Sequence, residues 1–279
     1  MAVRIVTDSS CDLTDEEVAA HGIEVVPLTI RFGDEELEDR TELSVEAFYE
    51  KLAASAVLPE TAAPAPGKFE AAFRRQQEAG ADAVVCINLS SDLSATMQSA
   101  RNAAKGVADS LDARVVDSRS ITSGLGTQVL LAAEAAAGGA SADEVVALAE
   151  GLARRTHVVG ALDTLDNLKK GGRIGGAQAL LGSLLSIKPI LDISSGKVEE
   201  AGKARTRKKA LEVLRDKVAE AGAIEHLCIT HGLAPDEAET LDLLAPLYPR
   251  EQIRVGLIGP VIGTHGGPRV MGVTWLAAP

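Results

Sequence analysis

Apolar and polar positions along the first half of the chain form blocks that predict strands followed by helices. Residues 3–6 and 83–89 are short apolar runs, and the second is almost unbroken, as expected for a strand covered on both faces. Residues 44–56 and 94–107 carry apolar side chains at helical spacing. Strands that alternate with helices in this way predict a parallel sheet with helices on both of its faces.

Two segments near the N-terminus have a less regular pattern. Thr14 followed by Glu17 matches a capping box, which predicts a short helix that ends near Gly22. Residues 23–32 are predicted to be a second strand region. The acidic residues 34–39 that follow are predicted to form a loop.

The strict alternation is lost in the second half of the chain. Strand patterns occur at residues 157–162, 189–193, 197–201, 226–230, 253–257 and 270–276. Amphipathic helices are expected at about 208–221 and 235–245, and an apolar helix interrupted by Gly182 is expected to run to Ser186. These patterns predict an α+β arrangement with a mixed sheet.

The length and the charge narrow the class of protein. A chain of 279 residues allows two domains, so we predict an α/β fold with an N-terminal parallel-sheet domain at residues 1–157 and a C-terminal α+β domain at 158–279. The 28 Lys and Arg against 40 Asp and Glu give a net charge of −12, which speaks against nucleic-acid binding. No export signal is evident, and the apolar stretch 177–187 is shorter than the ~20 residues of a membrane span. A cytoplasmic location is therefore expected.

The motifs of the common autonomous enzymes are missing from the sequence. There is no phosphate-binding loop, no nucleophile elbow and no zinc-binding His-Glu-x-x-His helix, and residues 124–126 lack the third glycine of a dinucleotide fingerprint. The three cysteines are too widely spaced for a disulfide framework or a zinc cluster. We therefore predict no catalytic residue and no metal ligand.

Small hydroxyl-bearing residues gather where the predicted strands end. Such clusters occur at residues 7–10, 61–64, 90–96 and 117–120. Ser94 is placed as the N-cap of the helix after the central strand, and a helix N-terminus together with hydroxyl groups can hold an anion. In parallel sheets ligands bind at the carboxyl ends of the strands. The alternative is that these residues only cap helices and form turns.

Two basic segments and one glycine-rich segment stand out against the acidic background. Lys169, Lys170 and Arg173 surround a Gly-Gly break, and residues 203–209 contain five cations. Cations at the start of a helix oppose its dipole, which suggests that they serve an anionic ligand or an acidic partner. The alternative is a solvated charged face. Residues 259–268 combine several glycines with a single histidine, which is a weak signal alone.

Taken together and in this order, these segments resemble the DegV family of bacterial lipid-binding proteins. The matching segments are residues 7–13, 93–100, 117–118, 168–174, 186–190, 205–207 and 259–265. The resemblance implies a long-chain fatty acid buried between two domains and no further cofactor. In one branch of the family the carrier is the non-catalytic, lipid-binding subunit of a fatty acid kinase. It presents the carboxylate to a separate dihydroxyacetone-kinase-like ATP-binding subunit, which forms an acyl phosphate. A carrier role also leaves room for transient membrane contact.

The resemblance also implies roles for individual residues. Thr61 and Ser94 match the family's carboxylate-binding hydroxyl groups, and His265 matches the histidine beside the acid. Arg173 and Arg205 match arginines near the carboxylate mouth, where the partner would dock and phosphoryl transfer would occur.

The sequence departs from the family pattern at three places. Ala62 and Ala63 stand where the family often has polar residues, so polar groups near the head-group are lost. Ala95 replaces the usual glycine of its motif, and Arg269 stands where a glycine is common, which adds a cation near His265. These differences bear on head-group geometry and partner choice.

The physics of lipid burial fits this expectation. An acyl chain gains about 0.8 kcal/mol per buried CH₂, or on the order of 10 kcal/mol for roughly 16 carbons. The carboxylate is costly to desolvate unless several donors satisfy it, and a hydroxyl cluster beside an apolar cavity meets both needs. Two alternatives stay open: a free-standing acyl hydrolase that uses Ser94 and His265, and a lipid transport or sensing module without a kinase.

Overall fold

A four-stranded parallel sheet forms the N-terminal half of the molecule. The computed structural model describes residues 2–182 and 187–279. The strand order is β2-β1-β6-β7, and every neighbouring pair is parallel. The strands are β1 (Val3–Asp8), β2 (Glu24–Val26), β6 (Ala83–Asn88) and β7 (Asp112–Asp117). The parallel sheet predicted from the sequence is therefore confirmed.

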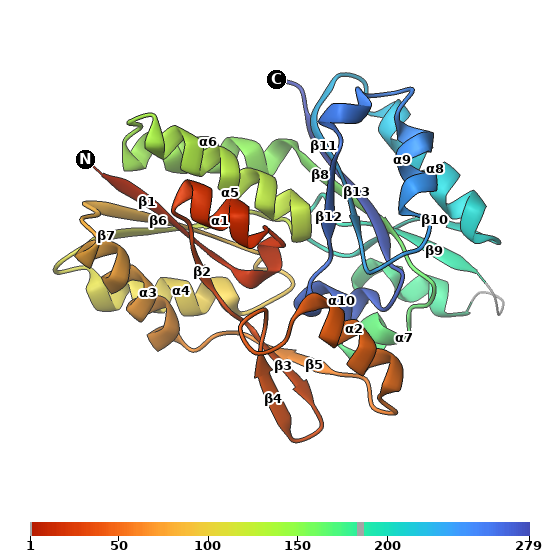
Figure 1. Ribbon diagram of the computed structural model, residues 1–279, viewed down its shortest axis with the longest axis horizontal. Helices are drawn as coiled ribbons and strands as arrows, with labels where there is room; N and C mark the ends of the chain where they lie inside the picture. The colour runs from red at the N-terminus through yellow and green to blue at the C-terminus, as the bar shows by residue number, and fades with distance from the viewer. Residues whose placement is uncertain (1, 183–186) are drawn as a thin grey trace.

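Helices cover both faces of this sheet (Figure 1). The helices are α1 (Asp15–His21), α3 (Pro66–Glu78), α4 (Thr96–Val107), α5 (Thr122–Ala137) and α6 (Ala142–Arg155). Val84 and Cys86 pack with α3 and α4, whereas Val85 and Ile87 pack with α5 and α6. Successive side chains of β6 thus enter opposite layers, which explains the almost unbroken apolar run of this strand.

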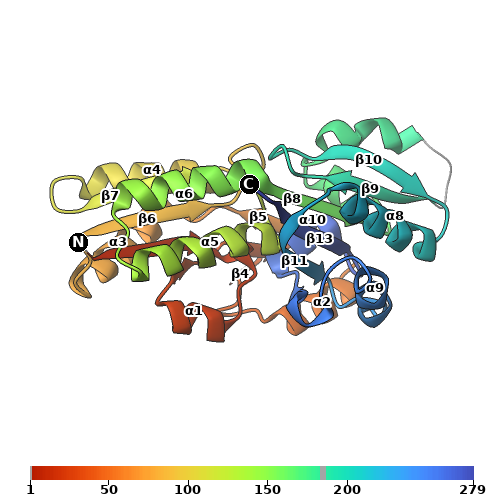
Figure 2. The ribbon, with the colours of Figure 1, turned by 90° about the horizontal axis from the view of Figure 1, so that it is seen from above.

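A six-stranded mixed sheet lies beside the parallel sheet along the long axis of the molecule (Figure 2). Its order is β10-β9-β8-β13-β11-β12, with antiparallel pairing except between β11 and β12. The strands are β8 (Thr156–Ala161), β9 (Lys188–Asp192), β10 (Glu199–Ala204), β11 (Ile224–His231), β12 (Arg254–Leu257) and β13 (Met271–Ala277). Helices α8 (Arg207–Glu220) and α9 (Glu237–Leu244) pack against this sheet. The predicted mixed sheet is confirmed.

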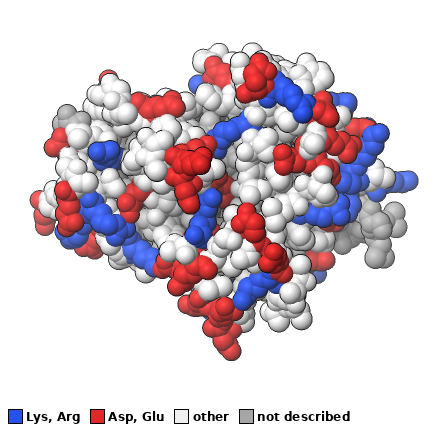
Figure 3. Space-filling model, viewed as in Figure 1, with Lys and Arg blue, Asp and Glu red and all other residues white. Residues whose placement is uncertain are grey.

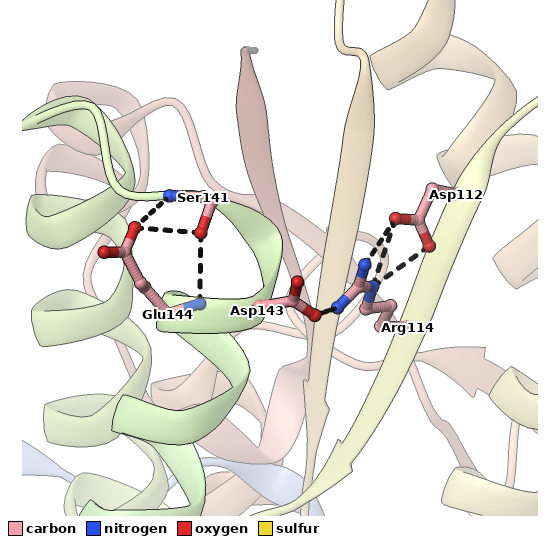
Figure 4. A network of polar contacts seen from close by, with 5 residues as sticks. All are labelled: Asp112, Arg114, Ser141, Asp143 and Glu144. Carbon is pink, nitrogen blue, oxygen red and sulfur yellow. Dashed lines mark hydrogen bonds and ion pairs between the residues drawn. The ribbon is translucent and has the colours of Figure 1, made fainter.

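The chain enters the mixed sheet directly from α6, because that helix ends at Arg155 and β8 begins at Thr156. The start of α6 is fixed by a capping box between Ser141 and Glu144 (Figure 4). In the same view Arg114 of β7 bridges Asp112 and Asp143. Exposed pairs of this kind add little stability.

The division into domains at residues 1–157 and 158–279 stays a prediction.

A third, small sheet corrects one prediction from the sequence. Strands β3 (Thr29–Phe32), β4 (Glu35–Glu38) and β5 (Glu60–Ala62) form an antiparallel sheet in the order β4-β3-β5. The acidic segment 34–39 is thus mostly an edge strand rather than a loop. Glu35 and Glu36 are exposed, and acidic side chains gather on this hairpin (Figure 3), while Leu37 packs on the core that contains Phe48. Gly33 turns the hairpin with φ +63°.

Two short helices attach this small sheet to the rest of the molecule. Helix α2 (Val45–Ala54) packs against α10 (Pro260–Gly266) through Phe48 and Val261. A Cβ at Gly263 would lie 2.7 Å from Cε1 of the Phe48 ring and 2.7 Å from the Tyr49 hydroxyl oxygen, so only glycine allows this close approach. Gly263 of segment 259–268 therefore serves helix packing.

The remaining elements are short. They are α7 (Asp166–Lys170) and the 3₁₀ helices η1 (Ser9–Cys11), η2 (Gly175–Gly182) and η3 (Arg250–Gln252). The apolar helix predicted to run to Ser186 is a 3₁₀ helix as far as Gly182, and its last four positions lie outside the described residues. No helix within the described ranges is long and apolar enough to cross a membrane.

Candidate functional site

A mainly aliphatic cavity lies where the carboxyl ends of β6 and β7 meet the mixed sheet and α10. Its volume is about 100 Å³. One water needs ~10–15 Å³ on this scale, so the space equals roughly seven to ten waters. Typical lining residues are Leu89, Leu93, Val158, Leu168, Leu191 and Ile262. Polar side chains in the lining come from Thr61, Ser94, Thr122, Arg173, Thr230 and His265.

Thr61 and His265 meet in this cavity although they lie 204 positions apart. The Thr61 Oγ1 atom is 3.0 Å from His265 Nε2. Burial, reinforced by the charge of Arg173, lowers the pKa of His265 to about 4. The imidazole is therefore neutral at pH 7. Its Nδ1 atom has no hydrogen-bond partner among the described residues.

The Gly-Gly break after α7 makes room for this histidine. A Cβ at Gly171 would lie 2.4 Å from His265 Nδ1, closer than van der Waals contact allows. A side chain at this position would displace the imidazole ring. The Gly-Gly break noted in the sequence is thus a packing requirement of the site.

Ser94 lies just before α4, one position ahead of the N-cap, whereas the sequence predicted that Ser94 is the N-cap. The N-cap is Ala95 and the helix begins at Thr96, because residues 90–95 form a turn before the helix. Ser94 Oγ accepts a hydrogen bond from the Thr96 N–H at 3.2 Å and lies 2.8 Å from Thr96 Oγ1. The N-cap prediction is therefore wrong by one residue, but Ser94 still lines the cavity.

Arg173 reaches the cavity from the segment after α7. Its Nε donates to the Leu93 carbonyl at 3.2 Å and its Nη1 to the Gly171 carbonyl at 2.6 Å. No carboxylate within the described ranges forms an ion pair with it. A half-buried guanidinium that is bonded only to neutral carbonyls can attract an anionic ligand.

Arg205 lies apart from these residues. It is exposed just before α8 and outside the cavity lining. Its neighbour Arg207 is paired with Asp236 at 2.6 Å. Lys and Arg side chains gather at the edge of the molecule where α8 lies (Figure 3). The structure thus brings Thr61, Ser94, Arg173 and His265 to one cavity, whereas Arg205 is on the surface.

The residues that depart from the family pattern lie outside the cavity lining. Ala62 is exposed and Ala63 is half-buried. Arg269 has φ +60° and its Nε is 3.6 Å from the Asp163 carboxylate, which opposes its charge. Ala95 only caps α4. How these four positions affect the head-group stays a prediction.

Two features of the cavity and its surroundings were missed from the sequence. The first is the pair Thr122 and Thr230, which also line the cavity. The second is a pair of buried acids, since desolvation raises the pKa of Asp12 and of Asp39 to about 7 each. Asp12 Oδ1 accepts from the Gly259 N–H at 3.0 Å and so holds the start of α10. Only a motif containing Asp12 pointed to this region.

The described part of the chain contains no group of three or more His, Cys, Asp or Glu residues that could hold a metal ion. Cys11, Cys86 and Cys228 are free and buried. Burial raises the pKa of each thiol. These cysteines are therefore not poised as nucleophiles.

Comparisons with known proteins find sequences that are similar to this chain over nearly its whole length. A family model described as "Uncharacterised protein, DegV family COG1307" matches residues 2–278. A DegV domain-containing protein of Streptomyces coelicolor is 40% identical over 97% of each chain. Protein DegV of Bacillus subtilis is 34% identical over 99% of each chain.

Solved structures show the same architecture. A DegV family protein from Thermus thermophilus, described as binding a fatty acid, has a TM-score of 0.91 with 35% identity, and 100% of each chain is covered. DegV from B. subtilis, described as a fatty acid binding protein, has a TM-score of 0.86 with 31% identity over 100% of each chain.

Proposed function

This chain belongs to the DegV family, and from that premise we propose that it binds one long-chain fatty acid in the cavity between its two larger sheets. The observation that carries the proposal is the cavity itself. Its lining is aliphatic except for a few hydroxyls, one neutral imidazole and one guanidinium. That division matches a ligand with a long apolar chain and one acidic end.

The aliphatic lining supports burial of the acyl chain. Each buried CH₂ gains about 0.8 kcal/mol, so a chain of roughly 16 carbons gains on the order of 10 kcal/mol. Since Arg173 is the only cavity-lining side chain, among the described residues, that is charged at pH 7, the rest of the lining imposes no charge-desolvation cost on the chain.

The polar groups support binding of the carboxylate. Because His265 is neutral, its Nε2–H can donate to Thr61 Oγ1, which frees the Thr61 hydrogen for a carboxylate oxygen. His265 is then a positioning residue. Ser94 supplies a second hydroxyl at the start of α4, and Arg173 supplies charge.

We further propose that the bound carboxylate is presented to a separate dihydroxyacetone-kinase-like ATP-binding subunit for acyl-phosphate formation. The chain itself is then a non-catalytic carrier in the cytoplasm that makes transient contact with a membrane. The N-terminal domain, residues 1–157, supplies the carboxylate-binding loops, and the C-terminal domain, residues 158–279, closes over the acyl chain. The exposed position of Arg205 supports a role in docking rather than in lipid binding.

The hydrogen bonds of Ser94 and His265 speak against a free-standing hydrolase. A Ser/His pair needs the serine hydroxyl within hydrogen-bond reach of the imidazole. Here His265 Nε2 is bonded to Thr61, and Ser94 Oγ is bonded to Thr96. A transport or sensing role without a kinase would use the same lipid site.

A titration of hexadecanoic acid into delipidated protein tests the proposal. We expect one site per chain, and Ser94→Ala should weaken binding because a buried acceptor loses a donor. Ser99→Ala in α4, the helix that follows Ser94, is the matched control, since Ser99 does not line the cavity. An equal effect of both variants, or turnover of acyl esters by the chain alone, would contradict the carrier proposal.

A further inference from the structure

A second polar group faces the same cavity, apart from the carboxylate-binding residues. It is the pair Thr122, at the start of α5, and Thr230, in β11. Their hydroxyl oxygens are 2.9 Å apart, and the residues are only 2% and 1% exposed. Thr61 and His265 form one hydrogen-bonded pair in the lining, and Thr122 and Thr230 form another.

The backbone holds Thr122 in an unusual conformation. Its φ is +47°, a region that β-branched residues rarely adopt. This backbone places the Thr122 hydroxyl against Thr230 of the neighbouring sheet. The pair joins the parallel-sheet layer to the mixed sheet across the cavity wall.

The hydrogen bond between Thr122 and Thr230 leaves part of the pair unsatisfied. Each hydroxyl has one hydrogen, and the 2.9 Å contact uses one of the two. When Thr230 donates to Thr122, the lone pairs of Thr230 Oγ1 have no donor within the described ranges. An unmodified CH₂ chain offers none.

We propose that the Thr122–Thr230 pair is a subsite for a hydroxyl group carried along the acyl chain, so that the cavity takes a hydroxylated long-chain fatty acid. The ligand hydroxyl donates to Thr230 Oγ1, and its own desolvation is thereby compensated. This inference rests on the proposed function and adds the class of fatty acid.

Binding of a positional series of monohydroxy-octadecanoic acids, together with octadecanoic acid, tests the subsite. We expect one hydroxyl position to bind at least tenfold more tightly than the other isomers, since its hydroxyl alone meets Thr230. Thr230→Val should abolish this preference among the isomers, whereas Thr230→Ser should retain it. Thr274→Val is the matched control, because Thr274 is buried in a neighbouring strand outside the cavity lining.

The outcomes separate this inference from the proposed function. If octadecanoic acid binds but all hydroxylated isomers bind with equal or uniformly lower affinity, the subsite is refuted and the fatty-acid site stands. If neither octadecanoic acid nor any isomer binds, the fatty-acid site falls and the subsite with it. The profile of the unmodified protein decides the question even if Thr230→Val fails to fold.

Discussion

Replacement of Thr61 by valine tests the head-group geometry without a change in shape. Valine fills the same space and suits a strand, so β5 should keep its pairing with Ile30 of β3. The substitution removes only the hydroxyl that lies 3.0 Å from His265 Nε2. In the proposed complex that hydroxyl also donates to the carboxylate.

The expected loss follows from the cost of an unsatisfied buried group. Leaving one buried donor or acceptor without its partner costs about 1–3 kcal/mol. Since 1.4 kcal/mol is a factor of ten, the Kd for hexadecanoic acid should rise about 5- to 140-fold. His265 stays neutral, because burial and Arg173, not Thr61, lower its pKa.

Isothermal titration of delipidated protein measures this change directly. Thr29→Val is the matched control, because Thr29 lies in the same sheet, is half-buried and does not line the cavity. The control should bind like the unmodified protein. If Thr61→Val also binds like the unmodified protein, the carboxylate is held elsewhere and the assignment of Thr61 and His265 is refuted.

Three further predictions follow from the structure. Burial raises the pKa of Asp39 to about 7. Between about pH 4 and 7 the folded protein therefore keeps a proton that the unfolded chain releases. The free energy of unfolding falls as the pH rises through this range. Asp39→Asn should reduce the difference in the free energy of unfolding between pH 5 and pH 8, measured by chemical denaturation. An unchanged difference would contradict this prediction. Gly171→Ala should raise the Kd for hexadecanoic acid at least tenfold by displacing His265, whereas Gly67→Ala, which meets no atom within 4 Å, should not; equal binding by both would refute the packing argument. Arg205→Ala should reduce phosphorylation with the kinase subunit and leave lipid affinity unchanged, so an equal loss of both would exclude a docking role.

The sequence was informative about the fold where one physical signal dominated. The almost unbroken apolar run 83–89 predicted a doubly covered strand, and β6 indeed packs on helices at both faces. The acidic segment 34–39 was misread because glutamates disfavour strands, yet in the structure Leu37 packs on the core while Glu35 and Glu36 are exposed. In this edge strand, the packing of Leu37 outweighs the low strand propensity of the glutamates.

The sequence predicted site residues only where their type is unusual for a hydrophobic core. A hydroxyl cluster at a predicted strand end pointed to Ser94, and the basic segment around the Gly-Gly break pointed to Arg173; both residues line the cavity. Thr230 lies inside an apolar strand, where a threonine is unremarkable, so its position on the cavity wall depends on which face of β11 meets α5. Arg205 shares a charge cluster with Arg207, and sequence gives no sign that the latter is neutralised by Asp236.

The mass of the protein after gentle purification, measured under native conditions, tests the central claim most directly. We predict a species whose mass equals the chain plus one long-chain fatty acid, and a return to that stoichiometry when delipidated protein is titrated with the acid. A chain that carries no fatty acid and takes up none on titration would contradict the account.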